Sequence, residues 1–392
     1  MSRAAATFSL GAVIAAACIF GLTYGLSAPL IAQALAARGV GETLIGMNAA
    51  LYAVGVLAVA RWLPRFAERV GLRTGTALAL LLVALVLPGF ALAALWLWFP
   101  LRFLLGAGSE GVFVLSEAWV NQLSSERSRA TTIAVYTAAL SLGFALGPLV
   151  LSAVGAHDVD AYWIGGACAI VALLLILAPG IHVPAFASDA RPAGLKSVVR
   201  LAPVALAAAA LNGALETAGL TFMPIYAMRL GWTAAGANAL IATLMIGAIV
   251  LQLPIGWLGD RYDRTKLVVA LAGLAALGAA IWPLLLRTVP LAYAVIFVWG
   301  GVFVGIYTLT VTAIGSRFSG GRLLGMYAGM SIAWGVGALV GPAATGVLME
   351  HVRHGLPVVA AAACAGFTVM VWERGSLVGR ARAGRVVGSG PA

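Results

Sequence analysis

The sequence predicts an all-α integral membrane protein with twelve transmembrane helices arranged as two six-helix bundles. Composition is the first reason: 62% of the residues are hydrophobic and 9% are charged, with a mean hydropathy of +1.03. A water-soluble surface needs far more charge. The second reason is that apolar runs of about 20 residues or longer, each able to cross a ~30 Å hydrocarbon core as a helix, recur along the chain. The third is an internal repeat that divides the chain into two similar halves, which is typical of secondary transporters.

The apolar runs follow one another in twelve segments. We predict membrane spans at residues 8–36, 43–63, 74–93, 95–121, 130–154, 160–179, 198–228, 235–258, 266–286, 289–316, 323–349 and 356–373. These runs do not alternate in polarity, as the strands of a membrane β-barrel would. The one long polar stretch separates six spans from six. It predicts an N-terminal bundle in residues 1–180, a linker at 181–197, a C-terminal bundle at 198–373 and a tail at 374–392.

The 24 basic residues indicate how the chain crosses the membrane. With the N-terminus in the cytoplasm, nineteen of them fall in cytoplasmic segments and four outside, and Arg102 lies within a span. The positive-inside rule therefore predicts that both termini are cytoplasmic, and we expect a multi-pass protein of the bacterial inner membrane. The net charge of +11 reflects this topology, so we expect no nucleic-acid partner.

A pattern of small residues occurs once in each half, in spans 5 and 11. Glycines four residues apart let two helix backbones approach closely in lipid, and a proline bends or loosens its helix. We expect six residues to serve helix packing in this way: Gly143, Gly147, Pro148, Gly337, Gly341 and Pro342.

A charged pattern follows spans 2 and 8. It resembles the loop motif of the major facilitator superfamily, Gly-x-Leu-x-Asp-Arg-x-Gly-Arg-Arg. The second copy has Gly256, Leu258, Asp260, Arg261 and Arg264 at the matching positions. The first copy, at residues 64–73, is degenerate and has Glu68 in place of Asp.

Further segments are similar to the same superfamily. Span 4 contains Arg102-x3-Gly106-x-Gly108, and the Gly-x3-Gly-Pro pattern of span 5 resembles a signature associated with exporters. The segment 116–121, Ser-Glu-Ala-Trp-Val-Asn, resembles poorly characterised bacterial members, the YcaD-type branch. The resemblance covers nearly the whole chain. It implies two bundles related by pseudo-symmetry, with spans 1, 4, 7 and 10 lining a central cavity.

The charged segments can pair across the two halves and hold one conformation. We expect such a conformational latch from five residues: Glu68, Arg69, Asp260, Arg261 and Arg264. The alternative is that these charges only set the topology.

Four charged side chains lie well inside predicted spans: Arg102, Glu110 and Glu117 in span 4 and Glu216 in span 7. Each would cost about 2.5 to 3.5 kcal/mol facing lipid at a helix centre, so each should face a cavity or a partner. The internal repeat places four apolar residues at the corresponding positions: Ile296, Val304, Val311 and Leu22. Because the other half folds without these charges, they indicate a functional site.

Carboxylates in a central cavity can couple transport to protons. Leaving water disfavours their charged form, so they can bind a proton on one side of the membrane and release it on the other. We expect Glu110 and Glu216 to act in this way. Glu117, seven residues after Glu110 and on the same face, is a further candidate, but pairing with Arg69 or another loop arginine is its alternative role. Arg102 has three open roles: binding an anionic substrate group, tuning Glu110, or anchoring at the membrane interface.

Polar and aromatic residues in the same four spans complete the predicted cavity. They are Tyr24, Ser27, Asn212, Thr217, Tyr307 and Thr308. Each of them, taken alone, can instead form a hydrogen bond between helices.

We therefore expect a proton-coupled exporter of small organic molecules that works by alternating access. Proton-coupled uptake and a non-transporting membrane sensor on the same fold are the alternatives. The expected partners are a small-molecule substrate, protons and the lipid bilayer, and we expect a monomer with no cofactor or metal, driven by the proton gradient. An enzyme is not expected, because the sequence has no phosphate-binding loop, metal-ligand cluster or nucleophile–base pair at useful spacing.

Overall fold

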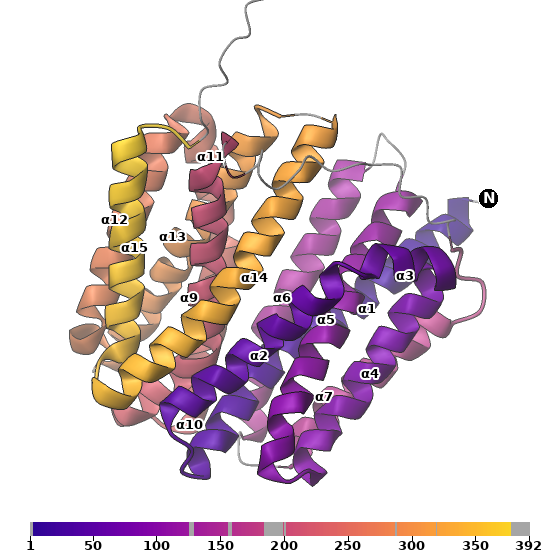
Figure 1. The fold of residues 1–392 in the computed structure, drawn as a ribbon, viewed down its shortest axis with the longest axis horizontal. Coiled ribbons are helices and arrows are strands. Elements are labelled where there is room, and N and C mark those ends of the chain that lie inside the picture. Colours follow the sequence, from indigo (N-terminus) through magenta and orange to yellow (C-terminus); the bar gives the residue numbers. More distant parts are fainter. Residues whose placement is uncertain are drawn as a thin grey trace, which may run out of the picture.

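A computed structural model describes residues 3–124, 129–155, 159–183, 199, 201–286, 288–318 and 320–377. Within them it contains twelve helices that are long and apolar enough to cross a membrane, which confirms the predicted all-α fold class (Figure 1). The predicted linker beyond residue 183 and the tail beyond residue 377 lie outside the described residues.

The two halves contribute six long helices each. The first half has α1 (Arg3–Ala37), α2 (Glu42–Ala60), α4 (Leu72–Leu92), α5 (Trp98–Leu123), α6 (Arg129–Val154) and α7 (Asp160–Leu177). The second half has α9 (Pro203–Arg229), α10 (Ala234–Val250), α12 (Arg264–Leu285), α13 (Val289–Gly315), α14 (Gly320–His351) and α15 (Gly355–Arg374). Three shorter helices lie within the described residues: α3 (Leu63–Val70), η1 (Leu95–Leu97) and α11 (Gln252–Arg261).

The packing of the first half is repeated in the second. In the first half, α1 packs on α6, α2 packs on α5, and α4 packs on α7. In the second half, the corresponding pairs are α9 with α14, α10 with α13, and α12 with α15. Between the halves, α2 packs on α14 and α10 packs on α6. These two contacts are equivalent, because α10 is the counterpart of α2 and α6 is the counterpart of α14. The sequence repeat is therefore a structural repeat.

The glycine pattern lies where helices of one half touch. A Cβ atom at Gly143 or Gly147 would overlap the backbone of α1, and one at Gly337 or Gly341 would overlap the backbone of α9. Pro148 and Pro342 lie inside α6 and α14, and the carbonyl of Pro342 also contacts Gly46 of α2. These glycines let α1 and α9 approach their partner helices closely.

The two charged motifs, expected in loops, lie largely on helices. The first forms α3, which buries Leu63 and Ala67 and exposes Arg65, Glu68 and Arg69. The second lies mostly on α11, which follows α10 after a turn at Leu251. Both short helices are therefore structured extensions of the membrane bundle.

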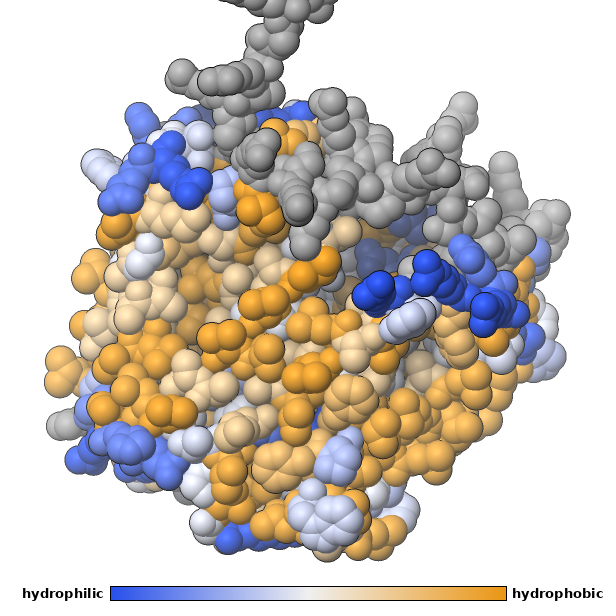
Figure 2. Space-filling model, viewed as in Figure 1, coloured by the Kyte–Doolittle hydropathy of each residue, from blue (hydrophilic) through white to orange (hydrophobic). Residues whose placement is uncertain are grey.

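The two ends of the bundle differ in charge. The end that carries Arg69, Arg73, Arg261 and Arg264, uppermost in Figure 1, is called the basic end below. The other end, where α1 connects to α2, is called the opposite end. Figure 2 shows a broad apolar surface between polar groups at the two ends, as expected of a chain surrounded by lipid.

Polar contacts join the two halves at the opposite end. Arg229 of α9 forms an ion pair with Glu42 of α2. The backbone N–H of Thr43 donates to the Glu350 carboxylate of α14 at 2.9 Å. We call the residues that make these contacts, together with a buried amide pair between α1 and α10, the closure cluster; its members are Gln33, Glu42, Thr43, Arg229, Asn238 and Glu350.

The amide pair of the closure cluster is fully buried. Gln33 Nε2 donates to Asn238 Oδ1 at 2.7 Å, and Gln33 Nε2 also donates to the Pro29 carbonyl. The other ion pair among the described residues, Arg264 with Asp260, lies within the second half. The halves are thus held together at the opposite end.

Candidate functional site

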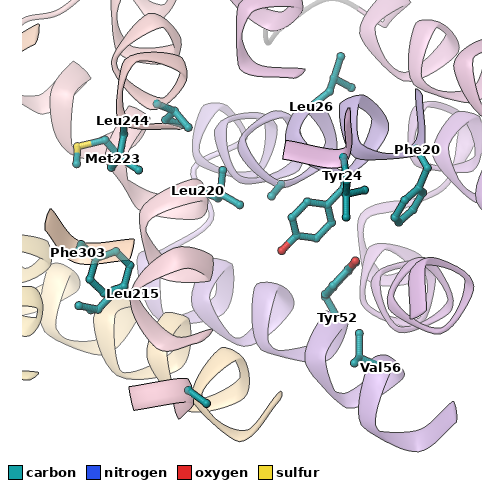
Figure 3. Packing of buried hydrophobic residues seen from close by; sticks show 14 of the residues in the cluster. Phe20, Tyr24, Leu26, Tyr52, Val56, Leu215, Leu220, Met223, Leu244 and Phe303 are labelled. Carbon is teal, nitrogen blue, oxygen red and sulfur yellow. The ribbon is translucent and has the colours of Figure 1, made fainter. Parts of the chain in front are cut away.

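Two tyrosines from neighbouring helices face each other in the middle of the molecule. The ring centroids of Tyr24 on α1 and Tyr52 on α2 are 5.4 Å apart, and Figure 3 shows the two side chains extending into the same space between the helices. Tyr24 also packs on Phe144 of α6 at 5.1 Å. Tyr24 was a predicted cavity residue, whereas Tyr52 was missed because it lies in the second span.

Arg102 of α5 lies beside this tyrosine pair. Its side chain is buried, with a residue exposure of 4%, and its guanidinium lies 5.2 Å from the centre of the Tyr52 ring. Neither Nε nor Nη1 has a hydrogen-bond partner among the described residues. A membrane-interface anchor would be exposed at the end of the span, so this geometry argues against that alternative. The aromatic ring stabilises the cation, but no carboxylate of the described residues forms an ion pair with it.

Glu216 of α9 approaches the same region from the second half. Asn212 Nδ2 donates to its Oε2 at 3.1 Å, and Trp334 Nε1 of α14 donates to the same oxygen at 3.4 Å. The side chain is half-buried and interacts electrostatically with both tyrosines. It forms no ion pair within the described parts of the chain. Trp334 was not predicted, because only spans 1, 4, 7 and 10 were expected to line the cavity.

Glu110 and Glu117 lie on the side of α5 that faces the protein interior. One turn before Glu110, Gly106 packs against the backbone of Tyr52 on α2. Glu110 interacts electrostatically with Tyr52, and Glu117 with Tyr307 of α13 in the other half. Both carboxylates are half-buried.

The alternative role of Glu117, pairing with Arg69, is not seen. Among the described residues Glu117 forms no ion pair, and the Arg69 side chain is exposed on α3. Three of the four intramembrane charges are therefore spread along α5 of the first half, with about 22 Å between the positions of Arg102 and Glu117 along the helix axis, and Glu216 lies on α9 of the second half.

The hydroxyl groups of three other predicted residues are used within the scaffold. Ser27 donates to the Tyr24 carbonyl at 3.0 Å, and Thr217 donates to the Gly213 carbonyl at 2.6 Å. Thr308 donates to Gln252. For Ser27 and Thr217 this geometry favours a packing role. Asn212 holds Glu216, and Tyr307 is half-buried near the carboxylates.

The five predicted latch residues do not form ion pairs across the halves in the described part of the structure. Arg264 donates to the Gly259 carbonyl at 3.0 Å and forms an ion pair with Asp260 of the same half. Arg261 lies 3.8 Å from the centre of the Trp257 ring, and Glu68 and Arg69 are exposed. A latch between the halves at the basic end stays a prediction.

The site offers proton-binding and charge-recognition groups. Among the described residues no group of three or more His, Cys, Asp or Glu side chains could hold a metal ion. What the arrangement brings together is carboxylates on both halves, a buried arginine and aromatic faces, between two bundles of like architecture. Such a set can bind a charged organic molecule and exchange protons.

Comparison with known proteins identifies the family. The model of the Major Facilitator Superfamily matches residues 13–242 and 205–383. The chain is 27% identical to an uncharacterized MFS-type transporter, YfkF of Bacillus subtilis, over 65% of this chain and 67% of that protein. It is 24% identical to the MFS-type transporter YcaD of Salmonella arizonae over 80% of this chain and 81% of that protein.

Solved structures share the fold. A point mutant of the nucleoside transporter NupG superposes with a TM-score of 0.80 at 13% identity, covering 93% of this chain and 99% of that one. A bacterial homolog of the human lysosomal transporter Spinster gives a TM-score of 0.72 at 14% identity, covering 95% of both chains. The family match covers most of this sequence, and the predicted resemblance is confirmed. The chain belongs to the major facilitator superfamily and is a transporter rather than an enzyme.

Proposed function

We propose that this transporter exports small organic molecules by exchanging them for protons. Glu110 on the first half and Glu216 on the second bind the protons, and Glu117 assists on the path toward the basic end. The substrate and the proton compete for the carboxylates, so that one leaves as the other binds. The two six-helix bundles expose the site alternately to the two sides of the membrane.

The placement of Glu216 is the observation that carries this proposal. Its carboxylate is held by Asn212 and Trp334 in the interior of the protein without an ion-pair partner among the described residues. A carboxylate with a permanent cationic partner would stay charged, whereas one held by neutral donors can gain and lose a proton.

We further propose that the basic end lies in the cytoplasm of a bacterial cell, with the protein in the inner membrane. The unequal distribution of arginine and lysine supports this orientation. The closure cluster then lies on the outer side, and the conformation described above has its halves joined on that side.

Proton flux in everted membrane vesicles tests the proposal. The vesicles contain the protein and a preformed pH gradient, and a panel of amines, acids and zwitterions is added. We expect at least one compound to dissipate the gradient. Glu110→Gln and Glu216→Gln are expected to abolish this response although the variants still insert. Glu373→Gln, an exposed glutamate at the end of α15, is the matched control and is expected to respond like the wild type.

Two outcomes would contradict the proposal. If protons and solute enter whole cells together, the protein is an uptake symporter. If no compound moves protons and the Glu110→Gln and Glu216→Gln variants behave like the wild type, proton coupling through these groups is wrong.

A further inference from the structure

Two opposite charges lie near the centre of the protein and do not neutralise each other. Arg102 belongs to the first half and Glu216 to the second. Both interact electrostatically with Tyr24, so the Tyr24–Tyr52 pair lies near both of them. The ion pairs among the described residues are Arg229 with Glu42 and Arg264 with Asp260, so neither central charge has an ionic partner.

Each of the two groups has free hydrogen-bonding capacity. On Arg102, Nε and Nη1 are buried without an acceptor in the described part of the chain, although the side chain is only 4% exposed. On Glu216, both hydrogen bonds go to Oε2, and Oε1 has no partner among the described residues. A buried guanidinium with unused donors is costly unless an anion joins it. This cost is the observation that points to a ligand.

The apolar part of the site is aromatic. The Tyr52 ring lies beside Arg102 and packs against Tyr24, and Trp334 reaches Glu216 from α14. Aromatic faces bind organic groups of many shapes and also attract cations. These aromatic groups are therefore suited to contact the carbon skeleton of a small molecule that binds to the charges.

We propose that the substrate is a zwitterion of the amino-acid type, with its anionic group on Arg102 and its ammonium group on Glu216. A purely cationic substrate would be repelled by Arg102 and would leave it uncompensated. A purely anionic substrate would be repelled by ionised Glu216. A zwitterion compensates both groups and connects the two halves. This proposal rests on the transport site described above, and it names the class of molecule that the site selects.

Binding to purified full-length protein in nanodiscs tests the charge requirement. The probes form two matched sets. The first is L-phenylalanine, its amine phenethylamine and its acid 3-phenylpropionate; the second is L-leucine, 3-methylbutylamine and 4-methylpentanoate. We expect at least one zwitterion to bind at least tenfold more tightly than both of its analogues, as measured by calorimetry and by ligand-induced thermal stabilisation. This comparison uses the wild type, so it does not depend on whether a variant folds.

Two substitutions then assign the charges. Arg102→Gln should weaken zwitterion binding at least tenfold, to the level of the amine, while binding of the amine is not weakened. Glu216→Gln should weaken the zwitterion to the level of the acid. Arg374→Gln and Glu373→Gln, both exposed at the end of α15, are the matched controls and should bind like the wild type. Arg102→Lys keeps the charge and should retain part of the affinity.

The proposal is overturned if neither zwitterion binds more tightly than both of its analogues. It is also overturned if Arg102→Gln and Arg102→Lys leave the preference for the zwitterion unchanged, since the arginine would then be structural. These measurements need no proton gradient. A preference for zwitterions can therefore be found even if the vesicle assay shows no proton exchange. Equally, the vesicle assay can show proton exchange when the binding assay shows no preference for zwitterions.

Discussion

An arginine of the first charged motif closes the end of a neighbouring membrane helix. The Arg73 guanidinium donates to the carbonyls of Ile176 at 3.1 Å, Leu177 at 2.7 Å and Ala178 at 3.1 Å, at the C-terminus of α7. The last carbonyls of a helix have no partner within the helix, and they carry partial negative charge. Arg73 donates hydrogen bonds to these carbonyls and brings a positive charge next to them, and it thereby connects α4 to α7.

Replacing Arg73 by alanine should therefore lower stability. Hydrogen bonds to charged groups contribute about 1.5 to 3 kcal/mol when buried, and this site is half-exposed, so we expect the lower part of that range. Thermal unfolding of the purified protein should shift down by several degrees. Arg69→Ala is the matched control, because Arg69 is exposed on α3, and it should leave the midpoint unchanged. Equal midpoints for the two variants would contradict this role for Arg73.

The sequence predicts the charged residues of the site but not all of its aromatic residues. Arg102, Glu110, Glu117 and Glu216 were found because a charge inside an apolar span is rare and costly. Aromatic residues are common in spans, and sequence periodicity does not tell which of them turn inward. Tyr52 was missed because candidates were taken only from spans 1, 4, 7 and 10, and Tyr52 lies in span 2. The sequence did contain a signal for Tyr52, because Arg102 inside an apolar span needs an aromatic ring or an anion beside it.

At the scale of elements, the close approach of α14 to α9 depends on glycine. A Cβ atom at Gly337 would overlap the Ala210 carbonyl, and one at Gly341 would overlap the backbone of Ala214. Gly337→Ala and Gly341→Ala should each push the helices apart and destabilise the protein by about 1 to 3 kcal/mol, the usual cost of overpacking. Unfolding midpoints and the yield of monodisperse protein measure this effect.

The matched control is a glycine with free space around it. Gly366→Ala in α15 meets no atom within 4 Å, so it should be neutral or slightly stabilising through higher helix propensity. If Gly366→Ala lost as much stability as the two α14 variants, the close packing of α14 on α9 would not be the cause.

Span positions were predictable, whereas the short helices that carry the charged motifs were predicted only in part. All twelve predicted spans overlap helices of the structure, because 20 apolar residues in succession have few other uses. Helix α3 was missed because its apolar positions, Leu63 and Ala67, are too few to give a periodic signal among charges. Most of α11 falls within the predicted span 235–258, but the turn at Leu251 that separates it from α10 was not predicted.

At the scale of the whole molecule, the repeat predicts two similar bundles but not their relative position. Transport requires at least two arrangements of the halves, and one sequence encodes both. The predicted latch residues, such as Asp260 and Arg264, pair within one half in the arrangement described here. The closure cluster at the opposite end could not be predicted, since Glu42 and Arg229 lie far apart in the sequence and show no shared motif.

The closure cluster should control how often the opposite end opens. Glu42→Ala removes the ion pair with Arg229 and leaves the arginine without its carboxylate. We expect a larger population with the halves apart at that end. Spin labels at Ala37 and Arg353, which are exposed there on different halves, report this as a shift toward longer distances in pulsed dipolar spectroscopy. The labels are placed in a background without Cys18, Cys168 and Cys364.

Two further variants show whether the ion pair itself is responsible. Exchanging the charges, with Glu42→Arg and Arg229→Glu together, should restore part of the short-distance population; the recovery is incomplete because Arg229 also donates to the Met349 carbonyl. Asp260→Ala removes the ion pair inside the second half at the basic end and should leave the distances unchanged. A surface ion pair alone contributes little free energy. A large shift of the distances in Glu42→Ala would therefore mean that the free energies of the two arrangements of the halves differ by only about 1 kcal/mol. Unchanged distances in that variant would mean that the buried Gln33–Asn238 pair and helix packing hold the halves together without the ion pair.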